Sequence, residues 1–289
     1  IVQSPQYFDT SKSSYKNSPL AYAGAYREEI FYRITQVARD RFDAAICCGS
    51  NAIYRREALL SIGGPKQVTA SEDSRTGFAL LNNGWKTRYI PVILAIGMCP
   101  DNIYAYFHQQ HRWVRGRSEL VLSSEFRNSK LSWKIKLCNI SGFLSFVLRP
   151  LELILSFQAI YLLFLYNQQA NFNGAFFLFF GYVFYSFILY PLYHLTPFKK
   201  EVFFASMIQI VASTHSVVSV IMGKSIAWIP TNAKHTTISN AFTQGILILA
   251  VYVSVYLGAL LILIYNQGTD IVLSTYGGGV KFWIVWNVI

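Results

Sequence analysis

The sequence feature that most constrains the fold is the uneven distribution of charged residues along the chain. Residues 1–142 contain 19 Lys and Arg and 11 Asp and Glu, whereas residues 143–289 contain only 6 and 3. A segment this long with so few charges is typical of chains that are solvated by lipid as well as by water. We therefore expect a water-exposed domain in the first half and a membrane region in the second.

Composition excludes several classes of protein. Of the 289 residues, 53% are hydrophobic and only 13% are charged, which argues against a disordered chain and against a coiled coil. Retention of Lys and Arg on the cytoplasmic side of a membrane explains the net charge of +11, so no nucleic-acid partner is expected. The cysteines and histidines lack the spacing of a metal site or a disulfide framework. They are Cys47, Cys48, Cys99, Cys138, His108, His111, His194, His215 and His235.

The two ends of the chain indicate a piece of a longer protein. No basic start and apolar run of a signal peptide follows Ile1, and the apolar run at 280–289 is too short to cross a bilayer. We therefore expect an internal fragment that ends in a truncated span.

The first half alternates helical and strand-like patterns, which predicts an α/β domain over residues 1–130. The expected helices cover 20–43, Arg56–Ile62, a segment from an N-cap at Ser71 to about Leu81, and Ile103–Glu125. The expected strands cover Ala44–Cys48 and Trp85–Ile90.

Two carboxylates open one of these helices, in the sequence Ser71-Glu72-Asp73. Acidic residues in a first turn complement the helix dipole, and this structural role explains them as well as a catalytic one does. The functional alternative is a general base, because a carboxylate held at the start of a helix can accept a proton from a substrate hydroxyl.

Gln109-x-x-Arg112-Trp113 lies inside the helix expected over Ile103–Glu125. Positions i, i+3 and i+4 share one helical face, so an amide, a guanidinium and an indole converge. This set suits a phosphorylated sugar, because Arg binds phosphate oxygens bidentately and a flat ring packs on a pyranose. The alternative is a solvated basic face with Trp113 in the core, and Arg115 and Arg117 are assigned to a basic, membrane-proximal face.

A third segment, Cys48-Gly49-Ser50-Asn51, is a small, flexible turn. Such a turn lets a substrate approach the backbone closely, although a plain structural turn explains it equally well.

In order along the chain, these segments resemble the processive family-2 glycosyltransferases, the group that contains cellulose synthase catalytic subunits. Val2-Gln3-Ser4-Pro5-Gln6 is similar to V-Q-T-P-Q of that family, Cys47–Asn51 to F-C-G-S/T-N, and Ser71–Asp73 to T-E-D. Gln109–Trp113 is a complete Q-x-x-R-W. The resemblance implies part of a glycosyltransferase-A-type α/β domain followed by an α-helical transmembrane bundle.

The resemblance also implies roles for individual residues. Asp73 would be the catalytic base, and Gln109, Arg112 and Trp113 would bind the nucleotide diphosphate and the acceptor end. Glu72, Cys48, Gly49 and Ser50 are assigned to substrate binding. The family's aspartate motifs, which hold uridine and Mg²⁺ or Mn²⁺, do not occur here, so the metal ligands are expected upstream of Ile1 and the fragment alone is expected to be inactive.

The second half contains four apolar stretches long enough to test as spans, since a membrane helix needs roughly 20 residues. Spans are predicted over about 151–166, 174–195 and 243–265, after a surface helix over 131–142. The fourth stretch, 202–223, is predicted to be an interfacial helix, because spanning would place Lys224 and Lys234 outside, against the positive-inside tendency. A spanning helix whose polar stripe lines a pore is the alternative. The stripe comprises Ser206, Gln209, Ser213, Ser216 and Ser219.

The loop expected over 224–242 contains a polar segment that resembles the family's F-x-V-T-x-K gating loop. Trp228, Thr231 and Lys234 would be its functional residues, with Thr231 and Lys234 near the donor phosphates. The segment departs from the pattern by Trp for Phe, Pro for Val and one extra residue before Lys. An ordinary interfacial loop with a Trp anchor is the alternative.

The function implied is an inverting, multi-pass glycosyltransferase of the plasma (inner) membrane with a cytoplasmic catalytic part. It would polymerise a UDP-sugar, expected to be UDP-glucose, into a β-linked polysaccharide and pass it across the lipid bilayer. The resemblance also admits accessory synthase subunits as partners. The alternatives are a non-processive transferase acting on a lipid acceptor, and a channel or transporter with a cytoplasmic regulatory domain.

Overall fold

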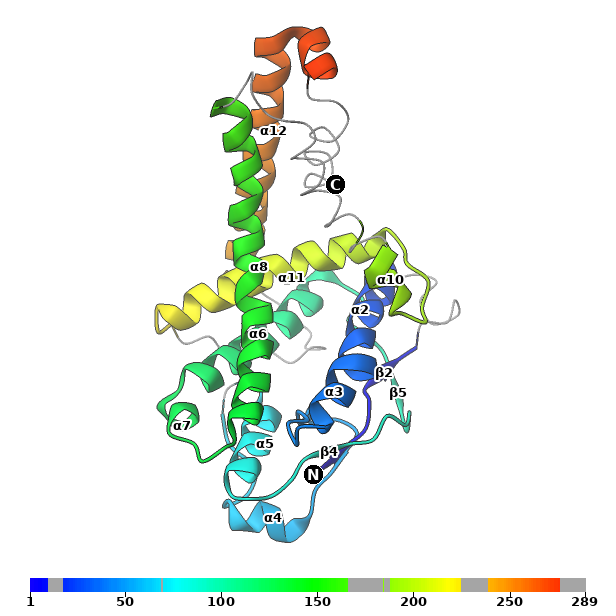
Figure 1. Cartoon of the computed structure of the whole chain (residues 1–289), viewed down its shortest axis with the longest axis vertical. Coiled ribbons are helices and arrows are strands. Elements are labelled where there is room, and N and C mark those ends of the chain that lie inside the picture. The colour runs from blue at the N-terminus through cyan, green and yellow to red at the C-terminus, as the bar shows by residue number, and fades with distance from the viewer. Residues whose placement is uncertain (10–17, 69, 166–183, 185–187, 225–238, 276–289) are drawn as a thin grey trace. The chain divides into compact units, whose positions relative to one another are not determined.

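The structure is a computed structural model that describes residues 1–9, 18–68, 70–165, 184, 188–224 and 239–275 (Figure 1). It divides into two compact units. Unit 1 comprises Ile1–Arg149 and Phe198–Phe242, and unit 2 comprises Pro150–Pro197 and Thr243–Ile289. The predicted functional residues Trp228, Thr231 and Lys234, most of the predicted span 174–195 and the truncated span 280–289 lie outside the described residues.

Unit 1 contains five short strands in two small sheets. They are β1 (Val2–Gln3), β2 (Tyr7–Phe8), β3 (Ala52–Ile53), β4 (Arg88–Tyr89) and β5 (Ile96–Gly97). In the mixed sheet β3-β1-β4, β1 pairs antiparallel with β3 and parallel with β4, with Val2 opposite Ile53 and Arg88. The second sheet is the parallel pair β2-β5, with Tyr7 opposite Ile96.

The helices of unit 1 follow the predicted pattern closely. The helix expected over 20–43 is a continuous run of α2, a π-helical turn η1 and α3, and the other expected helices start at their predicted residues. Their bounds are α2 (Pro19–Ile30), η1 (Phe31–Thr35), α3 (Gln36–Asp40), α4 (Arg56–Ser61), α5 (Glu72–Asn82), α6 (Ile103–Leu122), α7 (Ser124–Arg127) and α11 (Glu201–Ile221). Mixed sheets and helices thus form an α/β unit, as predicted.

The strand predicted over Ala44–Cys48 is wrong, because this segment has no regular structure. Its backbone is bonded by side chains instead of by a neighbouring strand. The Gln36 amide donates to the Ile46 carbonyl at 2.7 Å and accepts from the Ile46 N–H at 2.9 Å. The Thr87 hydroxyl donates to the Ala45 carbonyl at 2.8 Å. Buried backbone groups need partners, and here a buried amide and a hydroxyl supply them.

The hydrophobic core of unit 1 joins α5, the end of α6, α7 and the start of α8 (Trp133–Leu165). Phe78 of α5 packs in one cluster with Leu120, Phe126 and Ile135. Each large apolar side chain that is fully buried contributes about 1.5–3 kcal/mol to folding. This cluster fixes α5 and α6 relative to one another, and these helices carry two of the three predicted motifs.

Helix α11, which carries the polar stripe, packs against α6 and α2 within unit 1 (Figure 1). Arg27 of α2 donates to Ser206 and to Gln209, and Gln209 donates to Gln110 of α6 at 3.0 Å. The imidazoles of His111 and His215 lie 3.1 Å apart, and burial together with the neighbouring His215 lowers the pKa of His111 to about 3. The stripe therefore serves as a polar contact between helices.

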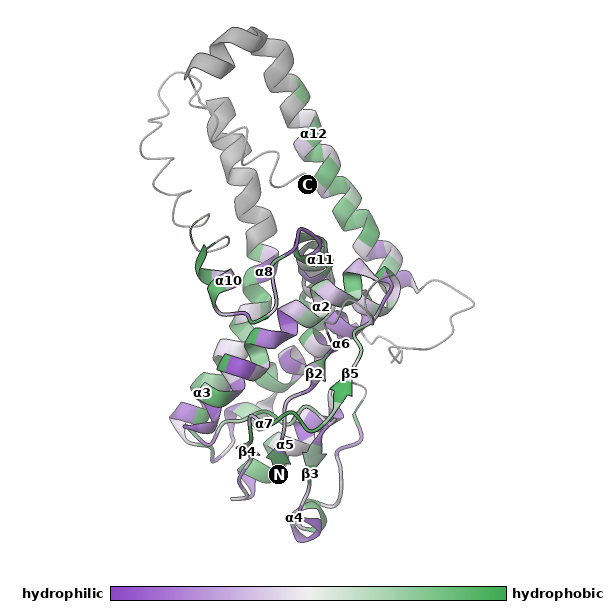
Figure 2. Ribbon diagram, turned by 90° about the vertical axis from the view of Figure 1, so that its right-hand side faces the viewer, coloured by the Kyte–Doolittle hydropathy of each residue, from purple (hydrophilic) through white to green (hydrophobic). Residues whose placement is uncertain are grey.

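Unit 2 contains the second part of α8, the short helix α10 (Tyr190–Leu192) and nearly all of α12 (Asn240–Thr275). Helix α8 is continuous from Trp133 to Leu165 through Pro150. The sequence predicted a surface helix over 131–142 and a separate span from about 151. The structure joins the two in one helix. In Figure 2 the coloured part of α12 is mostly hydrophobic.

Two described helices are long and apolar enough to cross a membrane, namely Glu201–Ile221 and Asn240–Gly258. In the first, 56% of the most apolar window is buried inside the protein, against 22% in the second. The first is the helix predicted to be interfacial and the second contains the start of a predicted span. Their placement at or across a bilayer stays a prediction.

Candidate active site

The turn Cys47–Asn51 is fixed by the N-terminal segment of the chain. The buried Gln3 amide accepts from the Cys48 N–H at 2.9 Å and donates to the Ser50 carbonyl at 2.7 Å. The Asn51 side chain donates to the Pro5 carbonyl at 2.9 Å. The two segments that resemble family motifs near the start of the chain therefore form one hydrogen-bonded unit.

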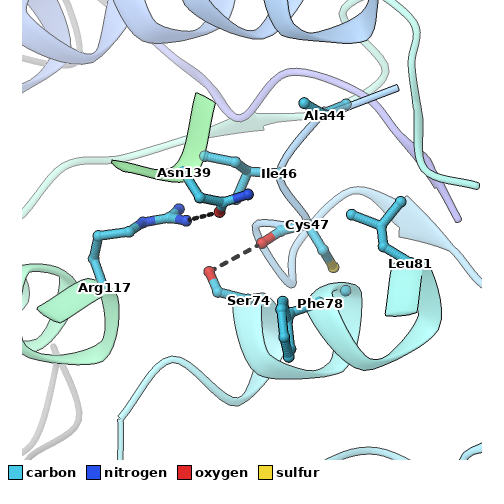
Figure 3. A pocket seen from close by; sticks show the side chains of 10 residues that line it. Ala44, Ile46, Cys47, Ser74, Phe78, Leu81, Arg117 and Asn139 are labelled. Carbon is cyan, nitrogen blue, oxygen red and sulfur yellow. Dashed lines mark hydrogen bonds between the residues drawn. The ribbon is translucent and has the colours of Figure 1, made fainter. Parts of the chain in front are cut away.

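Helix α5 approaches this turn so closely that glycine is needed on both sides. A Cβ on Gly49, which has φ +79°, would lie 3.0 Å from Oδ2 of Asp73. A Cβ on Gly77 would lie 2.9 Å from Cβ of Cys47. Ser74 also donates to the Cys47 carbonyl at 3.4 Å (Figure 3). These contacts place the Asp73 carboxylate directly against the backbone of the turn.

The start of α5 differs in detail from the prediction. Ser71 occupies the N-cap position, as expected, but it has a left-handed backbone with φ 53° and its hydroxyl makes no capping hydrogen bond. Asp73 instead accepts a hydrogen bond from the Ser74 N–H at 2.6 Å. A left-handed conformation in a residue with a side chain is uncommon and is strained, and such strain is often found at functional sites.

The pKa of Asp73 is raised above its ordinary value, chiefly by burial. The hydrogen bond from Ser74 and the charge of Arg117 act in the opposite direction, whereas Glu72 raises the pKa further. A raised pKa suits a general base, because it makes the carboxylate a better proton acceptor. Glu72 itself is exposed.

Helix α6 meets α5 through another close approach. A Cβ on Gly116 would lie 2.2 Å from the Ser71 hydroxyl oxygen, which is too close for any side chain. Arg112 lies one turn earlier on the same face of α6. The charges of Glu72 and Asp73 oppose the lowering of the Arg112 pKa, which is caused by burial. Arg112 and the two carboxylates thus share one electrostatic environment.

The other two residues of the α6 motif are also on this face by their spacing. Gln109 is buried, with 8% of its surface exposed, and Trp113 is half-buried. Partial burial of Trp113 does not decide between the core and the substrate-binding roles, and the binding role stays a prediction. An indole that keeps part of its surface open can still accept a sugar ring.

Sequence reasoning missed the role of two further arginines on α6. Arg115 and Arg117 were expected on a basic, membrane-proximal face, but both are buried, with 9% and 8% of their surfaces exposed. Arg115 pairs with Glu119 at 2.6 Å and donates to the Lys224 carbonyl, and Arg117 donates to Asn139 of α8 at 2.8 Å. The i, i+4 spacing of Arg115 and Glu119 was a signal for the first of these contacts.

A small cavity lies between the turn, α5 and α6, lined among others by Cys47, Ser74, Arg117 and Asn139 (Figure 3). Its volume of ≈ 20 Å³ is room for about one water molecule and excludes a sugar nucleotide. Within the described part of the chain, no group of three or more His, Cys, Asp and Glu side chains could hold a metal ion. The residues present therefore do not fit Mg²⁺ or Mn²⁺, and ligands elsewhere in the protein stay a prediction.

Comparison with known proteins gives a consistent result. The profile of glycosyl transferase family group 2 matches residues 1–264. Cellulose synthase 1 of Komagataeibacter xylinus is 31% identical over 148 residues, which is 51% of this chain and 10% of that protein. The catalytic subunit of cellulose synthase 1 [UDP-forming] from the same organism is 31% identical over 147 residues, 50% of this chain and 20% of that protein.

A third relative comes from a different genus. The cellulose synthase catalytic subunit [UDP-forming] of Pseudomonas fluorescens (strain SBW25) is also 31% identical over 147 residues, again 50% of this chain and 20% of that protein. The matching region thus makes up only a tenth to a fifth of the length of these three relatives.

Proposed function

This chain belongs to glycosyl transferase family group 2, and we propose that it forms part of the active site of a membrane-embedded, inverting glycosyltransferase. The whole protein would polymerise a UDP-sugar, with UDP-glucose as the donor, into a β-linked polysaccharide and pass it across the plasma (inner) membrane. Relatives described as UDP-forming cellulose synthase catalytic subunits support the choice of donor.

The single observation that carries the proposal is the position of Asp73. Its carboxylate lies against Gly49 of the turn, in the same electrostatic environment as Arg112 of the α6 motif. Three segments far apart in the sequence therefore supply a proton acceptor, a glycine-containing backbone turn and a cation within one region. This combination suits transfer to a hydroxyl with a diphosphate as the leaving group.

In the proposed mechanism, Asp73 accepts the proton of the acceptor hydroxyl while that oxygen attacks the anomeric carbon of the donor. The bond from that carbon to the diphosphate breaks on the opposite side, which inverts the configuration. Arg112 and Gln109 would stabilise the negative charge of the leaving diphosphate through charge-assisted and neutral hydrogen bonds. Trp113 would hold the terminal sugar of the acceptor by stacking on its C–H face.

The experiment is Asp73→Asn in the full-length protein. The substitution keeps the shape of the side chain and removes its ability to accept the proton, and loss of a general base costs on the order of 10²- to 10⁴-fold in rate. We expect polymer synthesis to fall by this factor while UDP binding is retained. Asp43→Asn is the matched control, because 42% of this side chain is exposed and it forms ion pairs with Lys86 and Arg88. Near-normal synthesis by Asp73→Asn would overturn the assignment.

The alternative enzymatic function is a single transfer of sugar to a lipid acceptor. The half-buried Trp113 favours the polymerase, because a stacking surface for the terminal sugar retains the acceptor between additions. The family match favours a glycosyltransferase over a channel or transporter.

A further inference from the structure

Arg117 presents a charge that its immediate contacts do not neutralise. Its guanidinium donates to the neutral Asn139 side chain at 2.8 Å, and among the ion pairs of the described residues none includes Arg117. A buried charge is costly unless a group of opposite sign lies near it. An anionic group close to the guanidinium would offset this cost.

Two contacts place Arg117 beside the first turn of α5. The preceding residue, Gly116, abuts Ser71 so closely that no Cβ would fit. Arg117 and Ser74 then line the same small cavity, together with Cys47 of the turn (Figure 3). The residues between Ser71 and Ser74 are Glu72 and Asp73, and Glu72 is exposed whereas Asp73 lies against Gly49.

The electrostatics identify Asp73 as the anion. Burial and the neighbouring charge of Arg39 lower the pKa of Arg117 to about 10, and the charges of Cys48 and Asp73 oppose this change. Burial also raises the pKa of the Cys48 thiol far above neutrality, so Cys48 is uncharged at neutral pH. In turn, the charge of Arg117 lowers the pKa of Asp73 against the effect of burial.

We propose that Arg117 is a positioning residue for Asp73, a buried cation that holds the carboxylate ionised and oriented without touching the substrate. The proposal rests on the proposed role of Asp73 as the base. It assigns the two arginines of α6 different tasks: Arg112, half-buried, faces the leaving group, whereas Arg117 acts from within the protein. Asn139 of α8 accepts a hydrogen bond from the guanidinium and so holds it in place.

The experiment measures the dependence of kcat/KM on pH for Arg117→Met and Arg117→Lys in the full-length protein. Met fills a similar volume without charge, so the pKa of Asp73 rises and the acid limb of the profile moves to higher pH by about one unit. Activity lost near neutral pH returns at higher pH, and KM for the donor stays unchanged. Arg117→Lys restores the cation and moves the limb back towards the original profile.

Two further variants distinguish the loss of the Arg117 charge from a loss of folding. Arg117→Met with Asn139→Leu replaces both partners of the hydrogen bond by apolar groups, which avoids an unsatisfied buried amide and provides a folded variant if the single substitution unfolds. Arg115→Met is the matched control, because Arg115 is equally buried on the same helix and pairs with Glu119 instead. Its acid limb is expected to stay in place.

Two results would overturn the inference. One is an unshifted acid limb in a folded variant that lacks the Arg117 charge, and the other is an equal shift in Arg115→Met. The failure of the proposed function is distinguishable from both, since it appears as near-normal synthesis by Asp73→Asn. If Asp73→Asn is inactive and the limb of Arg117→Met does not move, Asp73 keeps its role and only the role of Arg117 is wrong.

Discussion

At the scale of single residues, the candidate site contains two side chains on one helix that differ in what they can bind. Arg112 shares an electrostatic environment with Glu72 and Asp73, whereas Trp113 keeps part of an uncharged, flat surface open. A guanidinium prefers phosphate oxygens, and an indole face prefers a sugar ring. The proposed polymerase therefore predicts separable effects for neighbouring substitutions.

We expect Trp113→Ala to shorten the polysaccharide product while the affinity for UDP changes little. Stacking of this kind contributes roughly 1 to 3 kcal/mol, by analogy with bases on aromatic side chains. Arg112→Ala should weaken UDP binding more than it shortens the product, because no neighbour replaces the charge-assisted bonds of Arg112 to the diphosphate. Product length on isolated membranes and UDP affinity are the two measurements.

Trp133→Ala is the matched control for this comparison, since Trp133 is 69% exposed at the start of α8. Its product length should equal that of the unmodified protein. Equal losses of UDP affinity in the Trp113 and Arg112 variants, with unchanged product length, would mean that Trp113 only packs its helix. The single-transfer alternative would then be favoured.

At the scale of elements, the approach of α6 to α5 depends on the absence of a side chain at Gly116. We expect Gly116→Ala to lower both the midpoint of thermal unfolding and the rate of transfer. The new Cβ would lie 2.2 Å from the hydroxyl oxygen and 2.3 Å from Cβ of Ser71, so the helices must move apart. Overpacking of this kind costs about 1–3 kcal/mol.

Gly258→Ala on α12 provides the control, because a Cβ there meets no atom within 4 Å. Its unfolding midpoint should stay the same or rise slightly, since Ala has the higher helix propensity. An unchanged midpoint and rate in Gly116→Ala would show that the contact between Gly116 and Ser71 is looser than described.

Much of this arrangement could be predicted from the sequence, and the remainder could not for definable reasons. Helical spacing and capping residues predicted α2, α4, α5 and α6, and the motifs predicted which residues belong near the site. The strand at 44–48 was wrong because its apolar pattern is shared by any buried extended segment. Arg117 was misplaced because helical periodicity does not say which face a neighbouring element covers, and α5 and α8 cover this one.

At the scale of the whole molecule, the prediction concerns topology. A cysteine at position 200 and another at 224 should both be shielded from an impermeant thiol reagent outside intact cells, whereas a cysteine at 169 should react. The reason is that Lys199, Lys200 and Lys224 favour the cytoplasmic side. Position 169 lies outside the described residues, so this expectation rests on sequence alone.

Permeabilised cells are the control, because all three cysteines should react once the reagent can enter. Reaction at position 224 in intact cells would mean that α11 crosses the bilayer. It would also contradict the described packing of α11, in which its polar stripe is hydrogen-bonded to Arg27 and Gln110.

The irregular segment 44–48 has one more consequence, which concerns amide hydrogen exchange. The N–H groups of Ile46 and Cys48 are bonded to the side chains of Gln36 and Gln3, which have no exposed surface. Their protection from deuterium is therefore governed by the rotamers of two glutamines. In a hydrogen-exchange experiment, the amides of Ile46 and Cys48 should therefore be protected as in a β-strand, although this segment pairs with no strand.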